Sequence, residues 1–172
     1  MSLESNVLTW AQGKFGQKVG HGECWDLADQ ALRHAGARSS TTTGPQDDYD
    51  WGTPVGNLHA AQGGYILQFR NWRAVITEEG EGWSAEGYQE RGSPNHTAIV
   101  ERVLPYAVVV LEQNINHVHR VTRAELCIFD GTFERHHVTR HDDATDSELH
   151  LDVTQTVHTQ GQIRCYRPVA AT

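Results

Sequence analysis

The chain is short of basic residues and of long apolar runs, and each shortage excludes a class of protein. It has 14 lysine and arginine residues against 22 acidic residues, a formal net charge of −8, and the basic residues form no cluster. Because nucleic-acid binding needs such a cluster to neutralise phosphates, we expect no nucleic-acid partner. No apolar run approaches the roughly 20 residues that a membrane-spanning helix requires, so we expect no membrane partner either.

A secretory signal and a disulfide framework are also missing. The first residues, Met-Ser-Leu-Glu, have neither the basic nor the apolar region of a signal peptide. We therefore expect no signal peptide, and either a cytoplasmic location or export by a Sec-independent route. Three cysteines are too few, and odd in number, for a secreted domain held by disulfides. Cys127 and Cys165 lie in apolar, strand-like stretches, where cysteine behaves as a small buried hydrophobe.

With 172 residues, 38% of them hydrophobic, the chain is long enough for one domain with a buried core, and we assign residues 1–172 to it. Helical spacing of apolar residues predicts helices over residues 3–15 and 23–34. Strands are predicted at residues 65–69, 96–103, 106–112, 117–121, 129–138 and 162–166. Residues 39–57 and 77–95 are predicted loops, the second of them mobile, and residues 139–160 receive no role. This order favours an α+β fold in which N-terminal helices pack on an antiparallel sheet, and we expect a monomer.

Cys24 is the residue that points most clearly to a chemistry. It follows Gly-His-Gly-Glu at residues 20–23 and stands at the start of the second predicted helix. The first turn of a helix offers free N–H groups and the positive end of the helix dipole, both of which favour a thiolate. The Cys24 backbone N–H is also a natural donor to an oxyanion hole. Glu23 would oppose the thiolate, so we expect its side chain to point outward.

His96 and Glu112 are the candidate partners of this thiol. A three-residue loop after residue 102 would place His96 directly opposite Glu112 on the next strand, with about 5 Å between their Cβ atoms. Glu112 would then accept the second imidazole N–H and fix the tautomer. A two-residue loop would put Gln113 in that place instead, and Asn114 is a third candidate for the orienting role.

Three segments together resemble the CHAP and NlpC/P60 branch of the papain-like cysteine peptidases. They read Gly-Glu-Cys-Trp-Asp-Leu-Ala at 22–28, Asn-His-Thr-Ala-Ile-Val at 95–100 and Leu-Glu-Gln-Asn at 111–114. The resemblance implies Cys24 as nucleophile, His96 as base and Glu112 as orienting residue, in a cleft between the second helix and the sheet. It implies cofactor-free hydrolysis of amide bonds through a thioester acyl-enzyme, mostly in peptidoglycan. Tyr65 departs from the pattern, because the family usually has Asp there.

The two predicted loops should flank this cleft and select the substrate. Four side chains near the motifs are candidate substrate-binding residues: Trp25, Trp51, Gln113 and Asn114. The candidate partners are a peptide or peptidoglycan substrate and a cognate inhibitor protein.

Other interpretations of the same residues remain open. Cys24 could be a buried structural cysteine, and His21 could replace His96 as the base. The eleven histidines offer a metal-binding alternative, because His117 and His119 lie on one face of a predicted strand, an arrangement that suits zinc. Further ligands would come from His136, His137, His141, Asp142 and Asp143. No third ligand stands at a convincing spacing, so we assign no metal. A catalytically silent binding domain on the same scaffold is the remaining alternative.

Overall fold

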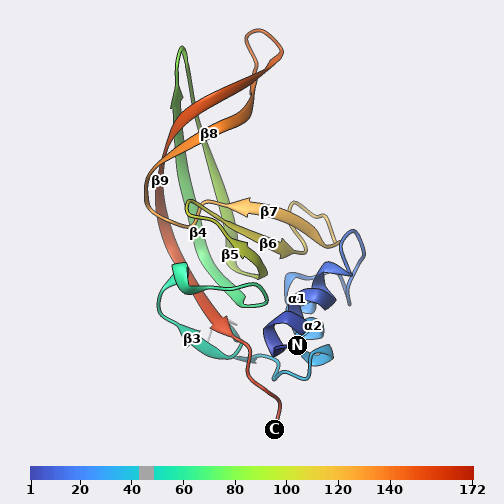
Figure 1. Ribbon diagram of the computed structural model, residues 1–172. Helices are drawn as coiled ribbons and strands as arrows, with labels where there is room; N and C mark the ends of the chain where they lie inside the picture. The colour runs from blue at the N-terminus through green and yellow to red at the C-terminus, as the bar shows by residue number, and fades with distance from the viewer. Residues whose placement is uncertain (43–48) are drawn as a thin grey trace.

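Two helices precede an antiparallel sheet, so the predicted α+β fold is confirmed (Figure 1). The computed structural model describes residues 1–42 and 49–172, so part of the predicted 39–57 loop lies outside the described residues. None of the described helices is long and apolar enough to cross a membrane. The described elements are α1 (Leu3–Gln12), α2 (Cys24–His34), β1 (Thr41–Thr42), β2 (Tyr49–Asp50), β3 (Thr53–Val55), η1 (Leu58–Ala60), β4 (Ile66–Gly80), β5 (Trp83–Val103), β6 (Val108–Glu112), β7 (Thr122–Leu126), β8 (Gly131–Asp142) and β9 (Ser147–Arg167).

The two helices form close to where the apolar spacing predicts them. Ser2 caps α1, because its Oγ accepts a hydrogen bond from the Ser5 N–H at 3.1 Å. The helix ends at Gln12 rather than at the predicted residue 15, and the chain continues in turns. The second helix covers almost the whole predicted range. Its apolar stripe is buried together with that of α1, and the buried residues are Val7, Ala11, Leu27, Ala28, Ala31 and Leu32.

The larger sheet has seven strands in the order β3-β9-β4-β5-β6-β7, with β8 paired to β9. Strand β4 is its centre, because it pairs with β5 along one edge and with β9 along the other over nearly its full length. Buried side chains cover both faces of the sheet, since neighbouring residues of a strand point to opposite faces. Ile66, Ile99 and Leu111 face the helices, whereas Leu67, Val100 and Val110 belong to a second cluster.

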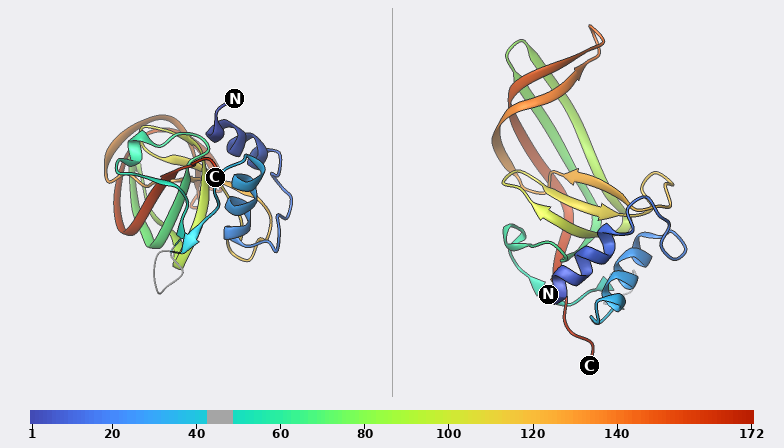
Figure 2. Two further views of the ribbon diagram at one scale, coloured as in Figure 1. Left: turned by 90° about the horizontal axis from the view of Figure 1, so that it is seen from below. Right: turned by 45° about the vertical axis from the view of Figure 1, so that its right-hand side comes forward.

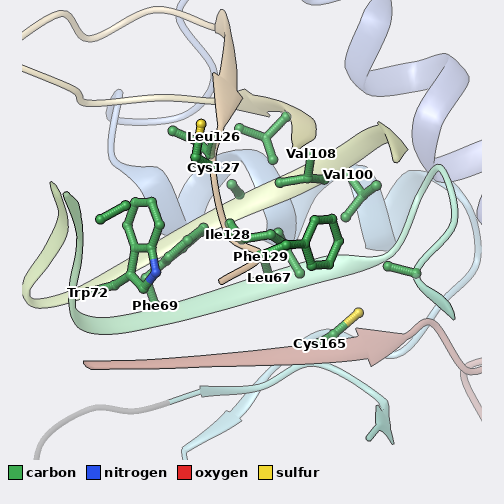
Figure 3. Packing of buried hydrophobic residues seen from close by; sticks show 14 of the residues in the cluster. Leu67, Phe69, Trp72, Val100, Val108, Leu126, Cys127, Ile128, Phe129 and Cys165 are labelled. Atoms are coloured by element: carbon green, nitrogen blue, oxygen red, sulfur yellow. The ribbon is translucent and has the colours of Figure 1, made fainter. Parts of the chain in front are cut away.

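Figure 3 shows the second cluster, in which Leu67, Phe69 and Trp72 pack with Leu126 and Phe129. Cys127 and Cys165 also lie in it, as the sequence predicts for structural cysteines. Burial raises the pKa of the Cys127 thiol to about 11 and that of Cys165 to about 12. Both side chains therefore carry an inert thiol at neutral pH.

Three segments differ from their predicted structure. Residues 77–95, predicted as a mobile loop, form the ends of β4 and β5, and only a short turn at residues 81–82 joins the two strands. Residues 117–121, predicted as a strand, instead lie in the turn before β7, where Asn116 and His117 have positive φ values of 51° and 63°. The polar residues 139–160, left without a role, form most of the β8–β9 hairpin.

A four-stranded extension projects away from the helices (Figures 1 and 2). It consists of residues 74–90 from β4 and β5 with residues 131–159 from β8 and β9, and we call these residues the arm. The strands of the arm are continuous with those of the body, because β4, β5 and β9 run from one into the other. One sheet therefore carries both the region next to Cys24 and the arm.

Candidate active site

The turn that leads into α2 fixes the position of Cys24. Gly20 and Gly22 have φ values of 58° and 84°, the left-handed region that glycine adopts without strain. A Cβ on Gly20 would lie only 2.7 Å from the Asp26 carboxylate carbon. That carboxylate accepts hydrogen bonds from the backbone N–H groups of His21 at 2.8 Å and Glu23 at 3.1 Å. Cys24 is thus the first residue of a helix whose entering turn is tightly held.

Gln113 holds the same turn from the sheet. Its Oε1 accepts from the Val19 N–H at 2.8 Å, and its Nε2 donates to the carbonyl oxygens of Val19 at 3.0 Å and Glu23 at 2.8 Å. The side chain is fully buried. The expectation that Gln113 binds substrate or orients the histidine is therefore wrong, because all three of its hydrogen bonds go to the backbone before α2.

His96 and Glu112 meet, although not in the predicted register. Glu112 lies opposite Ala98, and the pairing of β5 with β6 is irregular between Val100 and Arg102. The loop between these strands, residues 104–107, is longer than the two- and three-residue loops considered from the sequence. His96 and Glu112 are thus diagonal neighbours, which a long side chain can still connect. The His96 Nε2 lies 2.9 Å from the Glu112 Oε1. Since an ionised carboxylate only accepts, the imidazole donates through Nε2, and Nδ1 remains for the sulfur.

Arg91 is a member of this site that sequence reasoning missed. Its Nε and Nη2 each donate to one oxygen of Glu112 at 2.8 Å, which makes a bidentate ion pair. The Glu112 side chain is only 1% exposed, so its negative charge needs such a partner. Arg91 lies in the segment predicted as a mobile loop, and its only signal in the sequence was a single arginine in a run rich in glycine and glutamate.

The surroundings of Cys24 lower the pKa of its thiol. Burial alone would raise it, but a side-chain hydrogen bond with His96 and the positive charge that His96 can carry outweigh this effect. The backbone N–H groups of Thr97 and Trp25 also donate to the sulfur. Cys24 therefore differs from Cys127 and Cys165, for which burial dominates. It is neither sealed nor isolated, because it lines an open cleft.

The pKa shifts of His96 and Glu112 favour a charged imidazole and a charged carboxylate. Burial would lower the pKa of His96, but hydrogen bonds with Cys24 and Glu112 raise it. Burial would raise the pKa of Glu112, but hydrogen bonds from His96 and Arg91 and the Arg91 charge lower it. A raised imidazole pKa beside a lowered thiol pKa favours the thiolate–imidazolium ion pair. Glu112 stays ionised beneath that pair.

A cleft of about 560 Å³ opens above Cys24 and His96. Its lining is mostly polar: Cys24, Asn71, Trp72, Arg73, Glu90, Arg91, Gly92, Ser93, Asn95, His96, Asn114, Ile115, Asn116 and Gln160. Residues 90–95 flank the cleft as predicted for the segment 77–95, but as part of β5. No described residue of the segment 39–57 lines it.

Of the four predicted substrate-binding residues, only Asn114 lines the cleft. It donates to the carboxylate of the exposed Glu23 side chain at 2.8 Å. Trp51 is fully buried and donates to Gln68 at 2.8 Å, so the expectation that it binds substrate is wrong. Trp25 is half-buried, donates to Ser40 at 3.1 Å and packs near Trp51. It supports the start of α2 and does not line the cleft.

The other histidines do not join this site. The His21 side chain is exposed and is not among the residues that line the cleft. His119 lies 3.2 Å through Nδ1 from the Gly22 carbonyl oxygen, in a turn and not in the predicted strand. Within residues 1–42 and 49–172, no three His, Cys, Asp or Glu side chains converge on a possible metal position.

A helix that begins with cysteine, packed against an antiparallel sheet that supplies a histidine and a buried carboxylate, defines the papain-like cysteine-proteinase fold. The chain belongs to the family described as the AIM3/BBC1 cysteine proteinase-fold domain, whose model matches residues 2–172.

The chain is also similar in sequence to one known protein and in structure to another. The chain is 29% identical over 135 residues to "Altered inheritance of mitochondria protein 3" of Debaryomyces hansenii, covering 71% of this chain and 14% of that protein. The chain thus spans about one seventh of that relative's length. A solved structure titled "The crystal structure of Ly7917 with the hydrolyzing product of MDP" aligns with a TM-score of 0.47 at 16% identity, covering 96% of this chain and 82% of that chain.

Proposed function

We propose that this domain is a cysteine hydrolase that cleaves amide bonds through a thioester acyl-enzyme. The observation that carries the proposal is the row formed by Cys24, His96 and Glu112, in which the thiol pKa is lowered and the thiol lines an open cleft. A purely structural cysteine needs neither a hydrogen-bonded imidazole nor access to solvent. A silent scaffold would have no use for a buried ion pair behind that imidazole.

The reaction follows from the positions of these groups. The Cys24 thiolate attacks the amide carbonyl carbon, and the backbone N–H of Cys24 donates to the oxyanion that forms. His96 then gives its proton to the leaving nitrogen as the C–N bond breaks, which leaves a thioester on Cys24 and a free amine. Next, His96 takes a proton from water, which attacks the thioester and releases the acid. His96 and Cys24 return to their starting ion pair.

Glu112 and Arg91 act through the imidazole. Glu112 accepts from Nε2 of His96 and so keeps Nδ1 directed at the sulfur. Arg91 fixes both carboxylate oxygens and keeps Glu112 ionised, so that it cannot take the imidazole proton. Both are positioning residues in this proposal.

We further propose that the site is of the CHAP and NlpC/P60 type within the papain-like fold, with peptide or peptidoglycan stem amides as substrates. The order of the three motifs supports this, as does a carboxylate at the end of the strand after the histidine strand. The polar, amide-rich lining of the cleft suits a substrate with many amide groups. A monomeric state, a cognate inhibitor protein, the absence of nucleic-acid and membrane partners, and either a cytoplasmic location or Sec-independent export remain predictions.

Trapping of the acyl-enzyme tests the chemistry without knowledge of the natural substrate. The protein is mixed with a small activated ester, p-nitrophenyl acetate, quenched in acid and measured by intact-protein mass spectrometry. We expect one added acetyl group on Cys24 in the wild type and none in Cys24→Ala. His96→Ala should acylate about 10²- to 10⁴-fold more slowly. Acetylation that persists in Cys24→Ala, or that maps to Cys127 or Cys165, would refute the proposal.

Digestion then tests the substrate. Purified peptidoglycan and a mixture of unstructured peptides are each incubated with wild type and with Cys24→Ala, and the products are identified by mass. New amines that depend on Cys24 identify the scissile bond. Acylation of Cys24 without digestion of peptidoglycan would exclude peptidoglycan as the substrate but would not contradict the hydrolase chemistry.

A further inference from the structure

The arm has a strand edge that no other strand covers. In the arm, β5 pairs with β4 from Trp83 to Arg91, and β6 joins β5 only from Ala98 onward. Within the described part of the chain, no strand pairs with the other side of residues 83–91. In an antiparallel strand, every second residue directs its N–H and C=O away from the paired neighbour. This edge of β5 therefore offers backbone donors and acceptors to an additional strand.

A groove of about 320 Å³ runs along this edge. Five consecutive residues of β5, 85–89, line it, which is the pattern of a backbone edge rather than of one face of a strand. Its other walls come from β4, β8 and β9, and from Glu125 at the end of β7 and Cys127 just after it. The Glu78 carboxylate lies in the groove and is held by Arg140 at 2.8 Å and Gln155 at 3.3 Å. The groove lies between two strand edges of one curved sheet.

One end of the groove is closed and the other is open. The Gln89 side chain donates to the Glu125 carbonyl at 2.8 Å and accepts from the Cys127 N–H at 2.9 Å. A side-chain amide thus takes the hydrogen bonds that a neighbouring strand would otherwise make. Beyond Gln89, toward the tip of the arm, the edge of β5 has no such cover among the described residues.

The two faces of this edge differ in chemistry. Pairing with β4 places Ala85 and Gly87 on the face of Glu78 and Ile76, inside the curved sheet. Glu86, Tyr88 and Glu90 lie on the outer face. A Cβ on Gly87 would meet nothing within 4 Å, so there is open space beside it. A strand added here would bury small side chains beside Ala85 and Gly87 and would place its alternate side chains near Glu86.

The charge of the protein is concentrated in the arm. Residues 74–90 and 131–159 hold eleven acidic residues against two arginines, a net charge of −9. The rest of the chain holds eleven acidic residues against twelve basic residues, a net charge of +1. The arm thus attracts positively charged partners and repels a second copy of itself.

We propose that the arm binds a basic polypeptide segment in extended conformation, which adds as a strand to the free edge of β5. A lysine or arginine on the outer face of the added strand would face Glu86, and small apolar residues at alternate positions would enter the groove. Backbone hydrogen bonds would supply affinity, and the alternating side chains would supply specificity. Acidic residues on an edge also discourage pairing between copies, which agrees with a partner of opposite charge.

Binding is measured with a short capped peptide in which lysine alternates with valine. Isothermal titration at about 50 mM salt gives the affinity, and hydrogen exchange shows which amides the peptide protects. We expect binding that weakens at higher salt, with new protection confined to alternate amides of residues 83–89. A glutamate–valine peptide should not bind. The lysine peptide methylated on alternate backbone nitrogens keeps its charge but cannot form the ladder, so it should bind at least about tenfold more weakly.

Matched substitutions locate the site. Glu86→Lys should weaken binding about tenfold. Asp143→Lys makes the same change of charge at a fully exposed position on the other hairpin of the arm and should change affinity by less than about twofold. Gly87→Val, which fills the groove and suits a strand, should prevent binding without lowering the melting temperature.

Three results would overturn the proposal. The first is no binding of the lysine peptide at about 50 mM salt, where charge attraction is strongest. The second is equal binding of the methylated peptide, or equal loss in both charge variants, which would show attraction without strand addition. The third is a dimer in sedimentation that Gly87→Val disrupts, which would make a second copy the occupant.

Discussion

Among the three cysteines, the environment of Cys24 differs in kind from the other two. Burial raises the pKa of Cys127 to about 11 and of Cys165 to about 12, whereas His96 and two backbone donors lower that of Cys24. Only the thiolate is alkylated at a useful rate. We therefore expect iodoacetamide to label Cys24 first between about pH 6 and 8. Peptide mapping after partial labelling checks this, and faster labelling of either buried cysteine would contradict it.

The labelling rate also reports on His96. Because the imidazole stabilises the thiolate, His96→Ala should move the midpoint of the Cys24 rate–pH curve to higher pH. His59→Ala is a suitable control, because His59 stacks on Phe129 and does not line the cleft. An unchanged midpoint in His96→Ala would mean that His96 does not set the Cys24 charge state.

Glu112 links the site to stability. Removing its charge by Glu112→Gln leaves the largely buried Arg91 without an ionic partner, so we expect a loss of about 3–5 kcal/mol in the free energy of unfolding at pH 7. The Glu112 pKa is lowered in the folded state, so its contribution is present above the unfolded pKa of about 4.3 and disappears as the pH falls through the folded value. The difference between wild type and Glu112→Gln should therefore shrink in acid.

Urea unfolding at pH 7 and below about pH 4 measures this difference. Glu101→Gln is the matched control, because Glu101 pairs with the more exposed Arg123 at 3.0 Å. An ion pair of this kind contributes about 1 kcal/mol or less. Equal losses in the two variants would contradict the special role of the Glu112 pair.

The sequence indicates which residues react but not how they are held. Cys24, His96 and Glu112 stand in short motifs with recognisable neighbours. Arg91 lies 21 residues from Glu112, and Gln113 lies 94 residues from Val19, so these contacts exist only after folding. The error over Gln113 has the same origin, because its motif shows that a polar residue is needed there but not which way its side chain points.

At the scale of elements, the turn before α2 depends on a side chain of the sheet. Gln113→Leu keeps the volume but leaves the Val19 N–H and two carbonyl oxygens without their partner, at a cost of about 1–3 kcal/mol for each buried group that stays unsatisfied. We expect a clear loss of stability and slower alkylation of Cys24, because the start of α2 loses its anchor. Asn114→Gly breaks an exposed bond to Glu23 and suits the positive φ of 64° at this position, so it should leave both nearly unchanged.

The long β4–β5 hairpin offers a second test at this scale. Strand β4 is paired on both edges, so its amides at residues 74–79 should resist hydrogen exchange. Strand β5 is paired on one edge there, so protected and unprotected amides should alternate over residues 83–88. Uniformly fast exchange over residues 77–90 would restore the interpretation of this segment as a mobile loop.

The two failed predictions that fall in the arm, residues 77–95 and 139–160, share one cause. The two helices bury a wide apolar stripe and were found, whereas the arm strands face solvent on one side and each other on the inside. Inside the arm, the Glu78 carboxylate accepts hydrogen bonds from Arg140 and from the buried Gln155. Such strands look like polar loops in the sequence, because the side chains that they direct inward include polar and small residues and leave no regular apolar alternation.

At the scale of the whole molecule, three strands run from the body into the arm, and buried apolar side chains become few along them. The body has a helical layer over Ile66 and Ile99, whereas its second cluster reaches the arm only at residues such as Val157, and Val153 is buried outside both clusters. Because β4, β5 and β9 are continuous, the arm has no anchor once the body unfolds. The body keeps its own core if the arm opens. Destabilising the body should therefore unfold the arm as well, whereas destabilising the arm should leave the body folded.

Two truncations of buried side chains test this asymmetry. Leu27→Ala in α2 should lower the free energy of unfolding by about 2–5 kcal/mol, and amides in body and arm should lose protection together. Val153→Ala removes about 1–3 kcal/mol of burial from the arm, and it should speed exchange mainly in residues 131–159 while the denaturant midpoint barely moves. A midpoint shift in Val153→Ala as large as that in Leu27→Ala would instead mean that arm and body unfold as one cooperative unit. The free edge of β5 could then not open or bind independently of the site at Cys24, because any change in the arm would alter the stability of both.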